Sequence, residues 1–259
     1  MCNCFFKKFL MNILLTNDDG YKASGITELF KSLSSEHKVF LVAPKENCSG
    51  MSAAISLRKE IEVEEINQNI FSVSGTPADC SYLGLLSVIP ESIEMIVSGI
   101  NLGANLGEDI FYSGTVGAAI AGRRLDYVPV AFSVTALNPQ NLPFIAEQSL
   151  QITNQVSKLP SNKNLLVNVN FPDLTSSEIK GTRITTLGKR GIPDTPDLIR
   201  AKDSFKYFSF GPSGSLLPDQ LGTDIQAIEQ NYISISILDY NLSADFAGWD
   251  FYREVFDCE

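Results

Sequence analysis

Two adjacent aspartates, Asp18 and Asp19, are the residues of this sequence best suited to bind a metal ion. They follow the apolar run 12–15, which predicts a strand buried on both faces of a sheet. Ligands of open α/β sheets bind beyond the carboxyl ends of the strands. Adjacent carboxylates repel each other, and a divalent cation, which prefers oxygen ligands, would offset that repulsion. The same residues also suit a plain turn, in which one aspartate caps a helix that begins near Ser24.

Uncharged polar residues follow the next two apolar runs. Ser49 and Gly50 lie in a polar loop after the run 39–43, and Asn101 and Asn105 follow the run 93–97. Serine and asparagine supply ligand atoms without adding charge, and the neighbouring glycines let the backbone approach a ligand closely. Those glycines recur at every fourth residue, which is not the G-x-G-x-x-G spacing of a dinucleotide site. An ordinary polar loop is the alternative at both places.

Hydroxyl residues open a helix that we expect over residues 115–124. Ser113, Gly114 and Thr115 stand at its start, where free backbone N–H groups can bind an anion. Simple N-capping by Ser113 is the alternative, and the sequence lacks the Walker A pattern of an ATP-driven motor. Three strand ends and one helix start would meet at one edge of the sheet. Together they predict a single pocket for a metal ion and a phosphate group.

Apolar runs alternate with segments of helical periodicity from residue 11 onward. This pattern predicts an α/β fold of three layers, in which helices cover both faces of a mainly parallel, doubly wound sheet. We expect strands at 12–15, 39–43, 61–66, 70–73, 93–97, 128–134 and 165–169, the third and fourth forming a hairpin. We expect helices at 26–33, 78–89, 115–124 and 144–159, with Thr76 and Pro77 capping the second of them.

The last third of the chain has a different character, because prolines and polar residues fill the segment 171–221. It predicts an excursion from the sheet, with strands at 183–187 and 206–210, that serves assembly. A helix at 224–229 and a strand at 232–238 are expected to follow. At the other end, residues 1–10 read as a disordered extension, because their short apolar pieces are split by two lysines. The chain is therefore expected to contain the extension 1–10 and a single α/β domain over 11–259, which consists of a core over 11–170 and a C-terminal part over 171–259.

The composition narrows the possible functions. The 30 acidic and 20 basic residues leave a net charge of −10, so nucleic acid is not expected as a partner. The single histidine, His37, argues against a Ser-His-Asp triad or a histidine-based metal site, and its polar surroundings predict a surface position. The five scattered cysteines indicate a reduced, cytoplasmic setting, and Cys80 is expected in the core. No apolar stretch approaches the ~20 residues of a membrane-spanning helix, so no membrane association is expected.

Several segments together resemble the SurE (survival protein E) family, in order and in spacing. They are ILLTNDDG at 13–20, AP at 43–44, SG at 49–50, GTPADC at 75–80, SGINLGAN at 98–105, YSGTVGAA at 112–119, GTDI at 222–225 and YISI at 232–235. The resemblance implies a Rossmann-like core whose C-terminal elements are exchanged between subunits, in a homodimer or homotetramer. One departure is Cys48, which stands where the family often has a basic residue.

The resemblance also implies a divalent-metal-dependent phosphatase acting on nucleoside 5′-monophosphates, with 3′-nucleotides and short polyphosphate as further substrates. One Mg²⁺ or Mn²⁺ ion per subunit would be held by Asp18, Asp19, Ser49 and Asn101. The phosphate would be bound by Asn105, Ser113, Gly114 and Thr115.

Asp18 and Asp19 are also the catalytic candidates. Either carboxylate could orient or deprotonate a water molecule, or Asp18 could attack the phosphorus and form an aspartyl-phosphate. The alternatives from other functional classes are a non-catalytic module that binds a nucleotide or sugar phosphate, and a purely structural oligomer.

Overall fold

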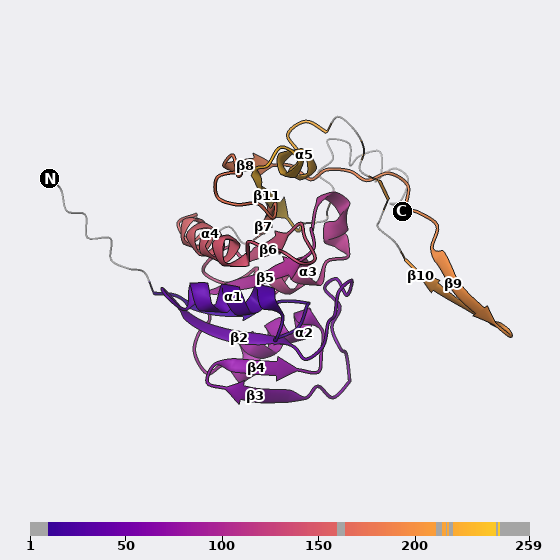
Figure 1. Ribbon diagram of the computed structural model, residues 1–259. Helices are drawn as coiled ribbons and strands as arrows, with labels where there is room; N and C mark the ends of the chain where they lie inside the picture. Colours follow the sequence, from indigo (N-terminus) through magenta and orange to yellow (C-terminus); the bar gives the residue numbers. More distant parts are fainter. Residues whose placement is uncertain are drawn as a thin grey trace, which may run out of the picture.

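The computed structural model describes residues 10–159, 164–210, 214, 215, 217, 220–241 and 243 of the 259-residue chain. Within these ranges nine strands form one sheet in the order β3-β4-β2-β1-β5-β6-β7-β11-β8 (Figure 1). Its middle, from β4 to β7, is entirely parallel. The antiparallel strands lie near its two edges, since β3 pairs with β4 and β11 with β7 in that direction. The predicted three-layer α/β fold with a mainly parallel sheet is confirmed.

The strands of the sheet are β1 Asn12–Thr16, β2 Lys38–Pro44, β3 Val63–Asn67, β4 Ile70–Val73, β5 Met95–Leu102, β6 Val130–Val134, β7 Leu165–Phe171, β8 Thr182–Thr185 and β11 Ile233–Asp239. A separate two-stranded sheet contains β9 Asp197–Lys202 and β10 Phe205–Ser209. The α-helices are α1 Ser24–Leu33, α2 Pro77–Leu83, α3 Gly114–Ile120, α4 Leu142–Val156 and α5 Asp224–Glu229. A π-helical turn, η1, covers Gly84–Val88, and a 3₁₀ helix, η2, covers Gly107–Phe111.

Strand β1 shows how the apolar runs build the two halves of the core. Ile13 and Leu15 belong to the cluster that packs against α1 and α4, whereas Leu14 belongs to the cluster on the opposite face, where Cys80 of α2 lies. Successive side chains of a strand point to opposite faces, so an uninterrupted apolar run is buried on both. Helices α1 and α4 pack together on one face of the sheet, and α2 and α3 pack together on the other (Figure 1). The predicted core position of Cys80 is confirmed.

Strand β5 is longer than its apolar run predicts. The expected end at residue 97 is wrong, because the strand continues through the glycine-containing segment to Leu102. Gly99 makes this possible: its φ is +122°, and a Cβ there would lie only 2.2 Å from the carbonyl oxygen of Phe132 in β6. Only glycine tolerates both conditions. The polar residues after Val97 are therefore held on the sheet rather than in a free loop.

Helix α2 is shorter than expected, since it ends at Leu83 and the π-helical turn replaces its second half. Its predicted cap is confirmed. The Thr76 hydroxyl accepts a hydrogen bond from the backbone N–H of Asp79, the Asp79 carboxylate accepts one from the N–H of Thr76, and Pro77 occupies the first turn.

The predicted surface position of His37 is wrong. The residue is buried, and its Nε2 lies 3.0 Å from Oδ1 of Asn154 in α4. The polar segment that precedes β2 is covered by a helix more than a hundred residues away in the chain, and local sequence carries no signal of that long-range packing.

Strands β9 and β10 form an antiparallel arm that projects from the body of the molecule (Figure 1). Strand β10 matches the expected strand at 206–210, but β9 has no counterpart in the sequence prediction. Every residue of the two strands is exposed, including Leu198, Ile199, Phe205 and Phe208. The expected disordered extension falls on residues 1–9, outside the described residues, except for Leu10, which is exposed. No helix within the described ranges is long and apolar enough to cross a bilayer.

Candidate active site

Asp18 lies directly beyond the carboxyl end of β1 and binds the first turn of α3. The hydroxyl of Thr115 donates to Asp18 Oδ1 (2.6 Å), and the backbone N–H of Thr115 donates to Oδ2 (3.2 Å). The alternative of an aspartate capping the helix near Ser24 is not found, because α1 begins after Ala23 and has no side-chain cap. Asp18 thus fixes the position of α3 relative to β1.

Gly114 allows this close approach. A Cβ at Gly114 would lie 2.8 Å from both Cβ and Oδ2 of Asp18. No Cβ fits there, so Gly114 permits the contact between Asp18 and α3 through its lack of a side chain. The preceding residue, Ser113, caps the helix, since its Oγ accepts the N–H of Val116 (3.1 Å).

Asp19 connects two strand ends. Its Oδ2 accepts the backbone N–H of Leu102 at the end of β5 (2.9 Å), and its Oδ1 accepts a hydrogen bond from the side-chain amide of Asn47 (3.2 Å). Asn47 in turn accepts the N–H of Ser49 through its Oδ1 (3.0 Å). The two aspartates are therefore held by different partners, and Asp19 ties the loop that carries Ser49 to β5.

The loop after β2 is held both by the end of β1 and by the start of α2. On the β1 side, the N–H of Cys48 donates to the carbonyl of Asp18 (2.7 Å). Farther along, the Thr76 hydroxyl donates to the carbonyl of Ala54 (2.6 Å), and Asp79 accepts the N–H of Ser56 (2.9 Å). The segment GTPADC thus braces the loop that presents Ser49, a role that its sequence alone does not reveal.

Burial makes the negative charge of Asp18 unfavourable. Only 3% of the residue is exposed, and burial, aided by the neighbouring charge of Asp19, raises the pKa of Asp18 from 3.8 to about 6, although the hydrogen bonds from Thr115 lower it. Burial also raises the pKa of Asp19, against the hydrogen bonds from Leu102 and Asn47. Two carboxylates with raised pKa values in one place are the electrostatic environment that a bound cation relieves.

One cavity of about 1000 Å³ gathers five of the predicted site residues. These are Asp18, Ser49, Asn101, Asn105 and Ser113. The three other predicted residues do not line it but lie beside it: Thr115 and Gly114 contact Asp18 from α3, and Asp19 binds the end of β5. The carboxyl ends of the parallel strands thus meet as predicted.

The cavity also has a wall that the sequence prediction missed. It includes Tyr112 before α3, Leu137 after β6, and Pro193, Asp194 and Phe210 at the base of the arm. Tyr112 directly precedes the predicted site residue Ser113, so the sequence could have indicated its place near the site. The residues near the arm gave no such signal, because their place depends on how the excursion folds back toward the sheet.

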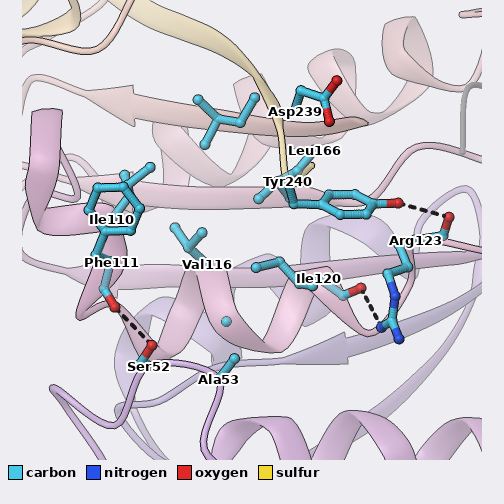
Figure 2. Close-up of a pocket in the computed structure, with 12 residues that line it drawn as sticks. Ser52, Ala53, Ile110, Phe111, Val116, Ile120, Arg123, Leu166, Asp239 and Tyr240 are labelled. Atoms are coloured by element: carbon cyan, nitrogen blue, oxygen red, sulfur yellow. Dashed lines mark hydrogen bonds between the residues drawn. The ribbon is translucent and has the colours of Figure 1, made fainter. Parts of the chain in front are cut away.

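A second cavity, of about 310 Å³, lies along another side of α3 (Figure 2). Its lining is mostly apolar and includes Val116 and Ile120 of α3 and Leu166 of β7. The hydroxyl of Tyr240 donates to the carbonyl of Arg123 at one end of it (3.2 Å). None of the predicted site residues lines this cavity, so the chemistry is expected in the larger one.

The predicted ligands in and beside the large cavity, Asp18, Asp19, Ser49 and Asn101, suit a hard divalent cation. Two carboxylates, a serine hydroxyl and an amide oxygen are the ligand types that Mg²⁺ and Mn²⁺ accept. The side-chain nitrogen of Asn101 donates to the carbonyl of Gly103 (2.8 Å), which leaves the oxygen as the ligand end of this amide. No group of three or more histidine, cysteine, aspartate or glutamate side chains among the described residues has a metal-binding arrangement. The fit therefore rests on two carboxylates complemented by neutral oxygens.

The family model described as survival protein SurE matches residues 13–194. The chain belongs to the SurE family. A relative named 5′-nucleotidase SurE, from Vesicomyosocius okutanii, is 40% identical over 233 residues, which are 90% of this chain and 93% of that protein. A relative named 5′/3′-nucleotidase SurE, from Wigglesworthia glossinidia brevipalpis, is 39% identical over 236 residues, with the same two shares of 90% and 93%. The crystal structure of a SurE protein from Aquifex aeolicus superposes with a TM-score of 0.80 at 32% identity and covers 94% of this chain and 99% of that one.

Membership of the SurE family confirms the resemblance drawn from the motifs, which lie on the elements described above. Four of them supply lining residues of the large cavity. Cys48, the residue that departs from the family pattern, is half-buried, and its Sγ lies 3.7 Å from the carbonyl oxygen of Gly75. Burial and nearby acidic groups raise the pKa of this thiol and so favour its neutral form. Unlike a basic residue, a thiol has no cationic form with which to attract a phosphate.

Proposed function

We propose that this chain is a divalent-cation-dependent phosphatase that releases phosphate from nucleoside 5′-monophosphates. The observation that carries the proposal is the buried, Thr115-bound Asp18 in the wall of the cavity that also contains Ser49, Asn101, Asn105 and Ser113. The names of the SurE relatives support a nucleotidase, and that of the Wigglesworthia protein adds 3′-nucleotides. A volume of about 1000 Å³ has room for a nucleoside monophosphate.

The proposed ligands of one cation per subunit, Mg²⁺ or Mn²⁺, are Asp18, Asp19, Ser49 and Asn101. When bound, such a cation offsets the developing charge of a phosphoryl group and activates water. Hydrogen bonds hold three of these four ligands in position: Thr115 orients Asp18, Leu102 orients Asp19, and the Gly103 carbonyl orients the amide of Asn101.

The phosphate is assigned to Asn105, Ser113 and the turn that contains Gly114. Asn105 and Ser113 line the cavity, and each carries a side chain able to donate to a phosphate oxygen. Thr115 is buried, and both its hydroxyl and its N–H donate to Asp18. Its predicted contact with phosphate stays a prediction, and in this arrangement it acts through Asp18. Fixed donors of this kind hold the phosphate in line for attack.

The remaining task is to orient the attacking group. An ionised Asp18 or Asp19 can accept a proton from a water molecule that lies between it and the phosphorus. Both oxygens of Asp18 accept hydrogen bonds from Thr115, which favours a fixed acceptor over a carboxylate that must turn to attack. We therefore propose direct attack by water. Isolation of an aspartyl-phosphate on Asp18 from labelled substrate would refute this choice.

The assembly is proposed to be a homodimer or homotetramer in a reduced, cytoplasmic setting. The exposed apolar side chains on both strands of the β9–β10 arm support an interface with a second copy. An isolated two-stranded hairpin is only marginally stable in water, and a partner that covers these side chains would stabilise it. The C-terminal exchange that the resemblance implies falls partly on residues 244–259, outside the described residues.

The proposal is tested by phosphate release from a panel of substrates in the presence of Mg²⁺ or Mn²⁺. The panel contains 5′-AMP, 5′-GMP, 3′-AMP, ribose 5-phosphate and tripolyphosphate. We expect the 5′-nucleotides to be hydrolysed with the highest kcat/KM. A folded protein that binds 5′-AMP but releases no phosphate from any member would instead support a binding module.

A further inference from the structure

A cluster of buried polar side chains holds Asn105 from beneath. The carbonyl oxygen of Asn105 accepts hydrogen bonds from the side-chain amides of Asn168 and Asn170, each at 2.9 Å. The backbone N–H of Asn105 donates to Asn170 Oδ1 (2.9 Å), and the Asn105 side-chain amide donates to the hydroxyl of Ser133 (2.8 Å). Four hydrogen bonds thus fix both the backbone and the side chain of one residue of the cavity wall.

The three supporting residues come from two adjacent strands. Asn168 and Asn170 are two positions apart on β7, so their side chains lie on the same face, and Ser133 of β6 is the register partner of Asn170. All three are fully buried, whereas their neighbours Phe132 and Val169 fill the apolar core on the other face. We call Ser133, Asn168 and Asn170 the polar platform.

Burial of the platform side chains lowers the stability of the fold unless hydrogen bonds, here those to Asn105, offset it. Buried amides are unfavourable when unpaired, and Asn168 Oδ1 has no hydrogen-bond partner among the described residues. Three of the bonds that its side chains do make go to the backbone of Asn105, and the fourth fixes the Asn105 side chain. Apolar residues at these positions would need no hydrogen-bond partners, so the platform is better explained by the position it gives Asn105.

We propose that Ser133, Asn168 and Asn170 are positioning residues that hold Asn105 in place to bind the phosphate of the substrate; this inference rests on the proposed function. The two bonds to its carbonyl oxygen fix the peptide, and Ser133 accepts one hydrogen of its side-chain amide, so the other hydrogen can donate to a phosphate oxygen. The platform is uncharged, which matters because a carboxylate at the same place would repel a phosphate dianion.

The test uses two platform variants and one matched control. Asn170→Asp keeps the size and the acceptor but replaces the donor to the Asn105 carbonyl by a negative oxygen. Asn168→Ala removes one hydrogen bond to Asn105 and also removes the unpartnered oxygen of Asn168. Because it introduces no buried charge, this variant can still be measured if Asn170→Asp does not fold. Asn154→Asp is the control: it too replaces an asparagine by a carboxylate, but at a part-buried position of α4 beside Glu36 and His37, near the amino end of β2.

Each protein is measured in three ways: the Kd of inorganic phosphate by calorimetry with Mg²⁺ present, kcat and KM for 5′-AMP, and the Mg²⁺ concentration that gives half-maximal activity. For Asn170→Asp we expect the phosphate Kd and KM to rise about 10-fold or more, and for Asn168→Ala about 3-fold or more. The half-maximal Mg²⁺ concentration should change less than about 2-fold. Among the described residues, the proposed cation ligand that adjoins the platform is Asn101, the register partner of Ser133, and neither variant changes Ser133. The control should lose stability only.

Wild-type values of the phosphate Kd and KM in both folded platform variants would overturn the inference while leaving the proposed function intact. An equal rise in the Asn154→Asp control would also overturn it, since the effect would then follow from lost stability. A wild-type protein that neither hydrolyses 5′-AMP nor binds phosphate would overturn the proposed function and the inference together.

Discussion

Replacing Asp18 by asparagine should make the cation-free protein more stable at alkaline pH. The pKa of Asp18 is raised from 3.8 to about 6, so keeping this residue ionised in the fold costs ~3 kcal/mol. Asparagine carries no charge and avoids that cost. Its Oδ1 can accept the N–H of Thr115 while its Nδ2 donates to the Thr115 hydroxyl, but these bonds are weaker than those of a carboxylate. We therefore expect a gain of about 2 kcal/mol at pH 8.

The pH dependence gives this prediction its sign. A carboxyl group whose pKa is higher in the folded than in the unfolded state lowers the stability as the pH rises from 3.8 through about 6. The advantage of Asp18→Asn should therefore vanish near pH 4 and be complete at pH 8. Groups far from residue 18 titrate alike in both proteins and cancel in the difference. Asp19 does not cancel, because its charge repels that of Asp18; loss of that repulsion adds to the advantage of the variant in the same direction.

The assay is urea unfolding in EDTA at pH 4, 6 and 8, with Asp203→Asn in the exposed turn of the arm as the control. Saturating Mg²⁺ or Mn²⁺ should then reverse the order, because only the wild type gains ~3 kcal/mol from a cation at 100 times its Kd. A variant that is less stable than the wild type at pH 8 in EDTA, or a difference that does not change with pH, would refute the reasoning.

Three further predictions concern the supports of the site and the arm. Gly114→Ala should lower kcat/KM about 100-fold, because its Cβ would lie 2.8 Å from Asp18 and displace that carboxylate; a near-normal rate would show that the contact is dispensable. Asp224 accepts the N–H groups of Gly107 and Gly188, both at 2.7 Å, so Asp224→Ala should lower the unfolding free energy by ~2 kcal/mol or more in urea titrations, and an unchanged midpoint would contradict this. Charging the arm by replacing both Phe205 and Phe208 with aspartate should turn a dimer or tetramer into monomers by light scattering, whereas a wild type that is already monomeric would remove the arm from assembly.

The sequence predicted the elements that are determined locally. Apolar runs such as residues 12–15 are buried because both faces of the parallel sheet are covered, and the polar residues that follow Leu15 and Ala43 lie at the same sheet edge for the same reason. The extension of β5 to Leu102 could not be predicted in this way, because it depends on how closely Gly99 approaches β6.

Long-range packing explains what else escaped prediction. The burial of His37 depends on a distant helix, the support of Asn105 on two strands that follow it in the chain, and the placement of Phe210 on the path of the arm. The β9 strand was missed because its residues are exposed on both faces, so its apolar side chains do not alternate with polar ones as they do in a half-buried strand.

The most direct test of the central claim is a cation titration of phosphate release. Protein stripped with EDTA is supplied with 5′-AMP and increasing Mg²⁺ or Mn²⁺, and wild type is compared with Asp18→Asn and with the Asp203→Asn control. The account predicts no release without cation, saturable release by wild type and control, and a rate at least about 100-fold lower for Asp18→Asn. Release that persists in EDTA, or that is the same in Asp18→Asn as in the wild type, would contradict it.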